Sequence, residues 1–127
     1  MQGARGTKER VRPMGSFRAL EANVKISIVR PGVDSNSAFG PGVARLCKGV
    51  REKGSLYAAA REMGMAYSKA WRIMKDTEAA LGMQLLDRDG AHGSSLTKDG
   101  DKLLDAYLEL EANVAKEAEE RFHDIVD

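Results

Sequence analysis

Four side chains between residues 67 and 72 carry the hydrogen-bond donors that proteins use to read nucleic acid. They are Tyr67, Ser68, Lys69 and Arg72. Lysine and arginine can donate to O6 and N7 of guanine in the major groove, while hydroxyl groups reach phosphates or base edges. If this segment is helical, the four side chains point away from its apolar residues. They then predict a base-reading surface, and the alternative is an ordinary solvated helix face.

Five further residues are candidates for contacts with phosphate. They are Ser55, Lys75, Arg88, His92 and Lys98. Ser55 stands where a helix is expected to begin, and the free N–H groups of a helix start attract anions. His92 lies in an expected turn, where an ordinary loop residue is the alternative. His123 is far from it along the chain, so the two histidines are not expected to share a metal.

The sequence contains no set of residues that suggests catalysis. Its one cysteine, Cys47, excludes a disulfide framework and a cysteine-rich zinc site. Cys47 also lies on an apolar helical stripe, where a small core residue is expected rather than a nucleophile. Phosphate-cradling glycine loops, metal-ligand clusters and nucleophile–base pairs are missing. We therefore expect neither enzymatic activity nor a cofactor.

Three helices are expected to position the candidate residues. The first begins near Pro41, buries a stripe of apolar residues with helical spacing, and ends at Gly54. Ser55 caps a short second helix that ends at Gly64. The third, at about residues 66–81, stops at Gly82. Two helices joined by a short glycine-containing turn form a helix-turn-helix, and the third helix would be the recognition helix.

A β-hairpin is expected after the third helix. Residues 83–88 can form a strand, residues 89–93 have the composition of a turn, and residues 93–96 can return antiparallel. The resulting wing covers about residues 84–97. The alternating segment 24–28 is expected to join it as a third strand, since an isolated hairpin is marginally stable. Trp71 is expected to anchor an interior that is poor in aromatic residues. The predicted fold is mainly α with a small β-sheet, a winged helix-turn-helix.

A long helix is expected from Lys98 to about Val126, with Thr97 as its cap. Apolar residues with alternating spacings of four and three, interrupted by Glu111, form the seam typical of a coiled coil. The seam residues are Leu104, Leu108, Ala115, Ala118, Phe122 and Ile125. A second stripe at Leu103, Tyr107, Leu110 and Val114 runs beside it. We expect one stripe to pack on the domain and the other to form a homodimer; a helix that only folds back on its own domain is the alternative.

The charges of the chain are divided between two regions. Of the 127 residues, 43% are hydrophobic and 31% are charged, which supports one folded domain. Residues 1–98 contain 17 Lys and Arg against 9 Asp and Glu, whereas residues 99–127 contain 3 against 10, so the formal net charge is only +1. This asymmetry favours a part that faces nucleic acid. We expect a basic flexible arm at residues 1–22, a winged helix-turn-helix domain at 23–98 and an acidic dimerisation helix at 99–127.

Several of these segments resemble the N-terminal DNA-binding domain of ModE-type molybdate-responsive regulators, and more distantly LysR-type regulators. The matching segments are Phe39-Gly40-Pro41-Gly42, Gly54-Ser55, Gly64 to Trp71, Leu81-Gly82, Arg88 and Leu96 to Gly100. They span about residues 23–110. Ala66 stands where the family usually has serine, and the wing loop is shorter than in ModE. The resemblance implies DNA binding. It would also imply a molybdate-binding domain after the long helix, but nothing follows Asp127, so molybdate or other oxyanion binding is not expected in this chain.

The sequence thus predicts a cytoplasmic transcription regulator that binds double-stranded DNA as a homodimer. Because no run approaches 18 apolar residues, no membrane span is expected. The alternative is a winged-helix module for protein–protein interaction that binds DNA only without sequence preference.

Overall fold

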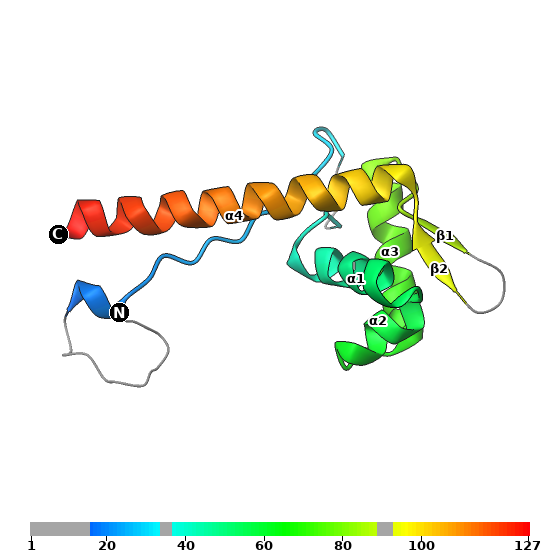
Figure 1. Ribbon diagram of the computed structural model, residues 1–127. Coiled ribbons are helices and arrows are strands. Elements are labelled where there is room, and N and C mark those ends of the chain that lie inside the picture. Colours follow the sequence, from blue (N-terminus) through cyan, green and yellow to red (C-terminus); the bar gives the residue numbers. More distant parts are fainter. Residues whose placement is uncertain (1–15, 34–36, 89–92) are drawn as a thin grey trace. The chain divides into compact units, whose positions relative to one another are not determined.

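The described part of the chain contains four α-helices, a two-stranded sheet and a short 3-10 helix, η1, at Phe17–Ala19 (Figure 1). The computed structural model describes residues 16–33, 37–88 and 93–127. Its contacts divide the chain into two compact units. One consists of Lys25–Glu111, and the other joins residues up to Val24 with Ala112–Asp127. The helix-turn-helix lies entirely within Lys25–Glu111, and it is confirmed.

Helix α1, Pro41–Lys53, forms and ends as its residues predict. Proline occupies the first turn, where its missing N–H costs no helical hydrogen bond. Gly54 ends the helix with φ +74°, a left-handed conformation that favours glycine. The predicted stripe is buried: Val43, Leu46, Cys47 and Val50. Gly49 adjoins this stripe, and a Cβ there would come 2.5 Å from Cβ of Ala59, so small residues permit the close crossing of α1 and α2.

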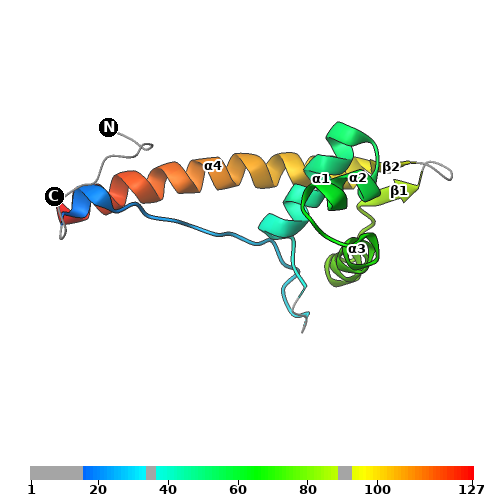
Figure 2. The same ribbon diagram turned by 90° about the horizontal axis from the view of Figure 1, so that it is seen from below.

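Helices α2, Leu56–Glu62, and α3, Tyr67–Leu81, complete the helix-turn-helix. The Ser55 hydroxyl accepts a hydrogen bond of 2.9 Å from the N–H of Ala58, which confirms the predicted cap. Gly64 turns the chain with φ +65°, and Gly82 ends α3 with φ +72°. Figure 2, in which α3 is seen nearly end-on, shows this helix at the edge of its unit. One side of α3 therefore faces away from α1.

The hairpin follows with β1, Leu86–Arg88, and β2, Ser94–Leu96. They pair antiparallel, with Leu86 opposite Leu96 and Arg88 opposite Ser94. The predicted turn at residues 89–92 lies outside the described residues. The N–H of Ser94 donates to the carbonyl of Gly54 at 2.9 Å, so the wing is attached to the α1–α2 junction.

The predicted third strand at residues 24–28 is wrong. Ile28 instead forms an isolated antiparallel bridge with Phe39, just before α1, with N–O distances of 2.9 and 3.0 Å. The alternation itself is present, because Ile26 and Ile28 are half-buried while Lys25 and Ser27 are exposed. Strand β2 bonds a different segment instead, because the N–H of Ser94 donates to the carbonyl of Gly54. Segment 25–28 therefore stabilises the domain by packing rather than by extending the sheet.

Helix α4, Lys98–Val126, begins at the predicted cap. The Thr97 hydroxyl accepts from the N–H of Gly100 at 2.9 Å and donates to the carbonyl of Gln84 at 2.7 Å. In the second unit, Glu119 accepts from the N–H of Ala22 at 2.8 Å and pairs with His123 at 2.8 Å. The hydrogen bond from Ala22, more than His123, lowers the pKa of the Glu119 carboxyl. The extended segment before Val24 is thereby attached to the last turns of α4.

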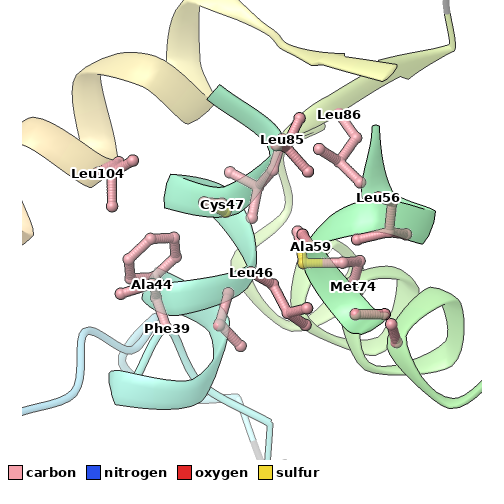
Figure 3. Packing of buried hydrophobic residues seen from close by; sticks show 14 of the residues in the cluster. Phe39, Ala44, Leu46, Cys47, Leu56, Ala59, Met74, Leu85, Leu86 and Leu104 are labelled. Carbon is pink, nitrogen blue, oxygen red and sulfur yellow. The ribbon is translucent and has the colours of Figure 1, made fainter. Parts of the chain in front are cut away.

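The core is mainly aliphatic, and Figure 3 shows the ring of Phe39 packed among its aliphatic side chains. Phe39 and Tyr107 meet edge to face with centroids 5.4 Å apart, and the Tyr107 hydroxyl donates to the carbonyl of Ile26 at 3.1 Å. Cys47 is completely buried, and burial raises the pKa of its thiol to about 12. The thiol therefore stays protonated at neutral pH, as befits a core residue rather than a nucleophile.

Candidate nucleic-acid interface

The N-terminal turns of α3 present all four predicted base-reading residues on its exposed side. Tyr67, Ser68, Lys69 and Arg72 are exposed, whereas the opposite side of α3 is buried. Among the residues that the structure describes, no carboxylate forms a salt bridge with Lys69 or Arg72. Both cations are therefore available to an external acceptor. The wing flanks this helix, because Arg88 of β1 contacts the ring of Trp71 and the N–H groups of Leu85 and Leu86 donate to Glu78.

The turn that leads into α3 borders a groove. Its volume is about 420 Å³, and its lining residues are Tyr57, Arg61, Gly64, Met65, Ala66 and Tyr67. The rings of Tyr57 and Tyr67 lie 6.0 Å apart across it. Ala66 offers no side-chain cap to α3, in keeping with the missing serine. Tyr57 and Arg61 extend the polar surface beyond the residues predicted from sequence.

The residues predicted to contact phosphate differ in their exposure and in their partners. Lys98 is exposed at the start of α4. Ser55 is half-buried and its oxygen is already bonded to Ala58. His92 lies outside the described residues. Lys75 and Arg88, by contrast, are brought together by one ring: Lys75 Nζ is 4.8 Å and Arg88 Cζ is 4.6 Å from the centroid of Trp71.

The prediction that Trp71 anchors the interior needs correction. Trp71 is only half-buried and packs against the edge of the core. The aromatic residues buried in the described interior are instead Phe39 and Tyr107, which pack among aliphatic side chains. The ring of Trp71 contacts two cations at the surface.

Glu78, which the sequence did not single out, joins the recognition helix to the wing. One oxygen of its carboxylate accepts from the N–H groups of Leu85 at 2.7 Å and Leu86 at 3.0 Å. The other oxygen lies 3.4 Å from Lys75 Nζ. Glu78 thus bonds backbone groups that the short hairpin cannot pair. Only the fold brings residues seven and eight positions apart together, so no local pattern could have identified it.

Replacing Glu78 by glutamine should lower the free energy of unfolding by about 1–2 kcal/mol, because two charge-assisted hydrogen bonds become neutral ones. Urea titration of both proteins measures the difference. Glu62→Gln is the matched control: its carboxylate lies 3.7 Å from Lys53 and is exposed, so little change is expected. Equal losses in both variants would contradict the role of Glu78.

The seam of α4 is divided between the core and the surface. Leu104 is completely buried within Lys25–Glu111, and Leu108 packs against the same core. Tyr107, from the second stripe, is also buried there. In the other unit, Ala118 and Phe122 are half-buried, while Ala115 is exposed and Ile125 is 74% exposed. Leu104 therefore packs in its own domain, and the exposed residues of the seam are Ala115 and Ile125.

None of the helices in residues 16–33, 37–88 and 93–127 is both long and apolar enough to cross a membrane. Within the same ranges, no three His, Cys, Asp or Glu residues are grouped to hold a metal ion.

Comparisons with known proteins agree with this architecture. Residues 44–101 match the family of bacterial regulatory helix-turn-helix proteins, lysR family. The chain is 39% identical over 75 residues to the molybdenum-pterin-binding protein MopB of Rhodobacter capsulatus; the match covers 56% of this chain and 28% of MopB. A crystal structure of the CbnR DBD–DNA complex is similar with a TM-score of 0.55 and 26% identity, covering 66% of this chain and 94% of that one.

The family match covers the surface described above. The family segment begins within α1 and ends in the first turn of α4, so it contains the helix-turn-helix and the wing. The likeness to MopB is consistent with the resemblance to ModE-type DNA-binding domains, although the chain spans little more than a quarter of MopB. Residues 44–101 are therefore similar to the helix-turn-helix segment of bacterial regulators of the lysR family, and the fold is that of a winged helix-turn-helix DNA-binding domain.

Proposed function

We propose that the chain is a cytoplasmic transcription regulator that binds double-stranded DNA sequence-specifically as a homodimer. The observation that carries the proposal is the exposed side of α3, where Lys69 and Arg72 have no carboxylate partner among the described residues. In a helix-turn-helix, the N-terminal residues of the second helix contact base edges in the major groove. Lys69 and Arg72 would then read guanine, with Tyr67 and Ser68 on base edges or phosphates.

The phosphate contacts are assigned to residues around this helix. Arg88 and Lys98 are exposed cations at the wing and at the start of α4, and Lys75 extends the row along α3. Ser55 accepts from Ala58 but keeps its own hydroxyl proton to donate to a phosphate. His92 completes the set as a prediction from sequence. The similarity to a chain solved with DNA supports this assignment.

Gel-shift titration tests the proposal. Wild-type chain is mixed with genomic fragments at moderate salt and compared with a Lys69→Ala/Arg72→Ala variant. We expect selective retardation of some fragments by wild type and loss of the selectivity in the variant. Lys116→Gln is a control, because it removes an exposed cation of α4 far along the chain from α3. Equal, salt-sensitive retardation of all fragments by wild type would instead favour a protein-interaction module with non-specific DNA binding.

A dimer would place two copies of α3 on half-sites about one helical turn, ~34 Å, apart or a multiple of that. We assign pairing to the residues of the α4 seam that remain accessible. These are Leu108, Ala115, Ala118, Phe122 and Ile125. Leu104 is buried in the core, so it would attach α4 to its own domain rather than contact a second copy.

Replacing Ile125 by glutamate should shift the chain from dimer to monomer, because pairing would bury an unpaired carboxylate in the seam. Sedimentation equilibrium measures the change, and we expect the dimer to weaken at least tenfold, about 1.4 kcal/mol. Asn113→Glu is the control, since Asn113 is exposed and lies on the opposite side of the helix. A monomeric wild type, or an unchanged Ile125→Glu dimer, would contradict the assignment.

A further inference from the structure

Trp71 occupies an unusual position between the recognition helix and the wing. It lies one helical turn before Lys75 on α3, and its ring also contacts Arg88 of β1. Part of the ring packs against the core, so the indole cannot turn freely. Two cations from different elements therefore share one fixed aromatic surface.

An indole holds a cation in a different way from a carboxylate. The ring face attracts the positive charge through its quadrupole but does not neutralise it. A guanidinium that lies over a ring also keeps its N–H groups free at its edge, in the fork that matches phosphate oxygens. In the described part of the chain, no carboxylate forms a salt bridge with Arg88. The guanidinium of Arg88 is thus held in one orientation, and its charge remains available to a phosphate.

Lys75 is fixed from two sides. Its ammonium group lies 3.4 Å from one oxygen of Glu78 and 4.8 Å from the centre of the Trp71 ring. The other oxygen of Glu78 bonds the backbone before and at the start of β1. Trp71 and Glu78 therefore hold Lys75 on the side of α3 that adjoins the wing, over the ring that also contacts Arg88.

We propose that Trp71 is a positioning residue that holds Arg88 and Lys75 together as one phosphate-binding site spanning the recognition helix and the wing. This inference rests on the proposed DNA binding. Trp71 is the one tryptophan of the chain. Its proposed role is to fix the position of Arg88, in the wing, relative to α3, the helix that reads the bases.

Substitution of Trp71 tests the proposal, with the full chain bound to a duplex that wild type selects. Trp71→Leu keeps an apolar side chain but has no aromatic face, and Trp71→Phe keeps a smaller one. We expect Trp71→Leu to bind about threefold to tenfold more weakly. The slope of log K against log salt should fall by about 0.9 for each phosphate that the variant no longer neutralises. Trp71→Phe should restore most of the affinity.

A double-mutant cycle separates positioning from structural damage. If Trp71 acts through Arg88 and Lys75, Trp71→Leu should cost little more once Arg88→Gln and Lys75→Gln are both present. A further loss from Trp71→Leu in that background as large as its loss in wild type would overturn the proposal. Lys116→Gln removes the same charge as Arg88→Gln from α4 and should leave both affinity and salt slope unchanged.

A second measurement needs no DNA. The ring current of Trp71 should shift the Nε–H proton resonance of Arg88 upfield in the free protein, and the shift should disappear in Trp71→Leu. Thermal unfolding establishes that the variant is folded. An unshifted Arg88 resonance in wild type, or wild-type affinity and salt slope in Trp71→Leu, would overturn the inference and leave the proposed function intact. Failure of wild type to bind any duplex would overturn both.

Discussion

Arg72→Ala should weaken binding to the preferred DNA site by about 1–3 kcal/mol, roughly fivefold to 150-fold. Arg72 is exposed on the second turn of α3, and no carboxylate among the described residues pairs with it. A bidentate contact with guanine depends on the planar guanidinium, which alanine lacks entirely. Because the contact reads one base pair, the preference should relax at one position of each half-site. Selection of randomised duplexes by wild type and variant measures both effects.

Lys75→Gln is the contrasting variant. Its ammonium group is assigned to phosphate, so every sequence should be weakened alike and the salt slope should fall by about 0.9. Arg72→Ala should leave most of the salt slope unchanged. If Arg72→Ala retained the preference at every position, α3 would not read bases through this residue.

Gly100→Ala should destabilise the fold by about 2–4 kcal/mol, because the site is overpacked and the blocking atoms are backbone. A Cβ at Gly100 would collide with the carbonyl oxygen of Leu85. That oxygen accepts the N–H of Thr97 at 2.9 Å, and Thr97 caps α4 through the N–H of Gly100. The carbonyl therefore cannot move without breaking the junction between the wing and α4. The higher helix propensity of alanine, about 1 kcal/mol, offsets only part of the cost.

Thermal and urea unfolding of Gly100→Ala measure this loss, and Gly42→Ala is the matched control. Gly42 also lies in the first turn of a helix, but a Cβ there would meet no atom within 4 Å. Alanine at Gly42 should leave stability unchanged or raise it by up to about 1 kcal/mol. Similar behaviour of the two variants would show that the contact with Leu85 is not what requires glycine at position 100.

The local parts of the fold could be predicted because they depend on neighbouring residues. Gly54 and Gly82 end their helices in the left-handed conformation, and Ser55 and Thr97 cap the helices that follow. The period of the apolar residues identified the buried side of α1 and, by exclusion, the exposed side of α3. The identity of the polar residues on that exposed side then gave the candidate site.

The features that were missed depend on contacts between distant segments. The alternation around Ile26 and Ile28 predicted a half-buried segment correctly, but alternation does not name the partner, and the bridge forms with Phe39. Residue type alone placed Trp71 in the core, because the sequence could not show that Phe39 and Tyr107 are the aromatic residues buried there. The bonds of Glu78 to Leu85 and Leu86 likewise appear only once α3 and the wing are folded.

Selection of bound fragments from genomic DNA by the wild-type chain tests sequence-specific recognition by α3 most directly. The expected result is a set of enriched fragments that share a two-fold symmetric motif, with half-sites separated by one helical turn, ~34 Å, or a multiple of it. Fragments bound in proportion to their abundance, with no shared motif, would contradict it.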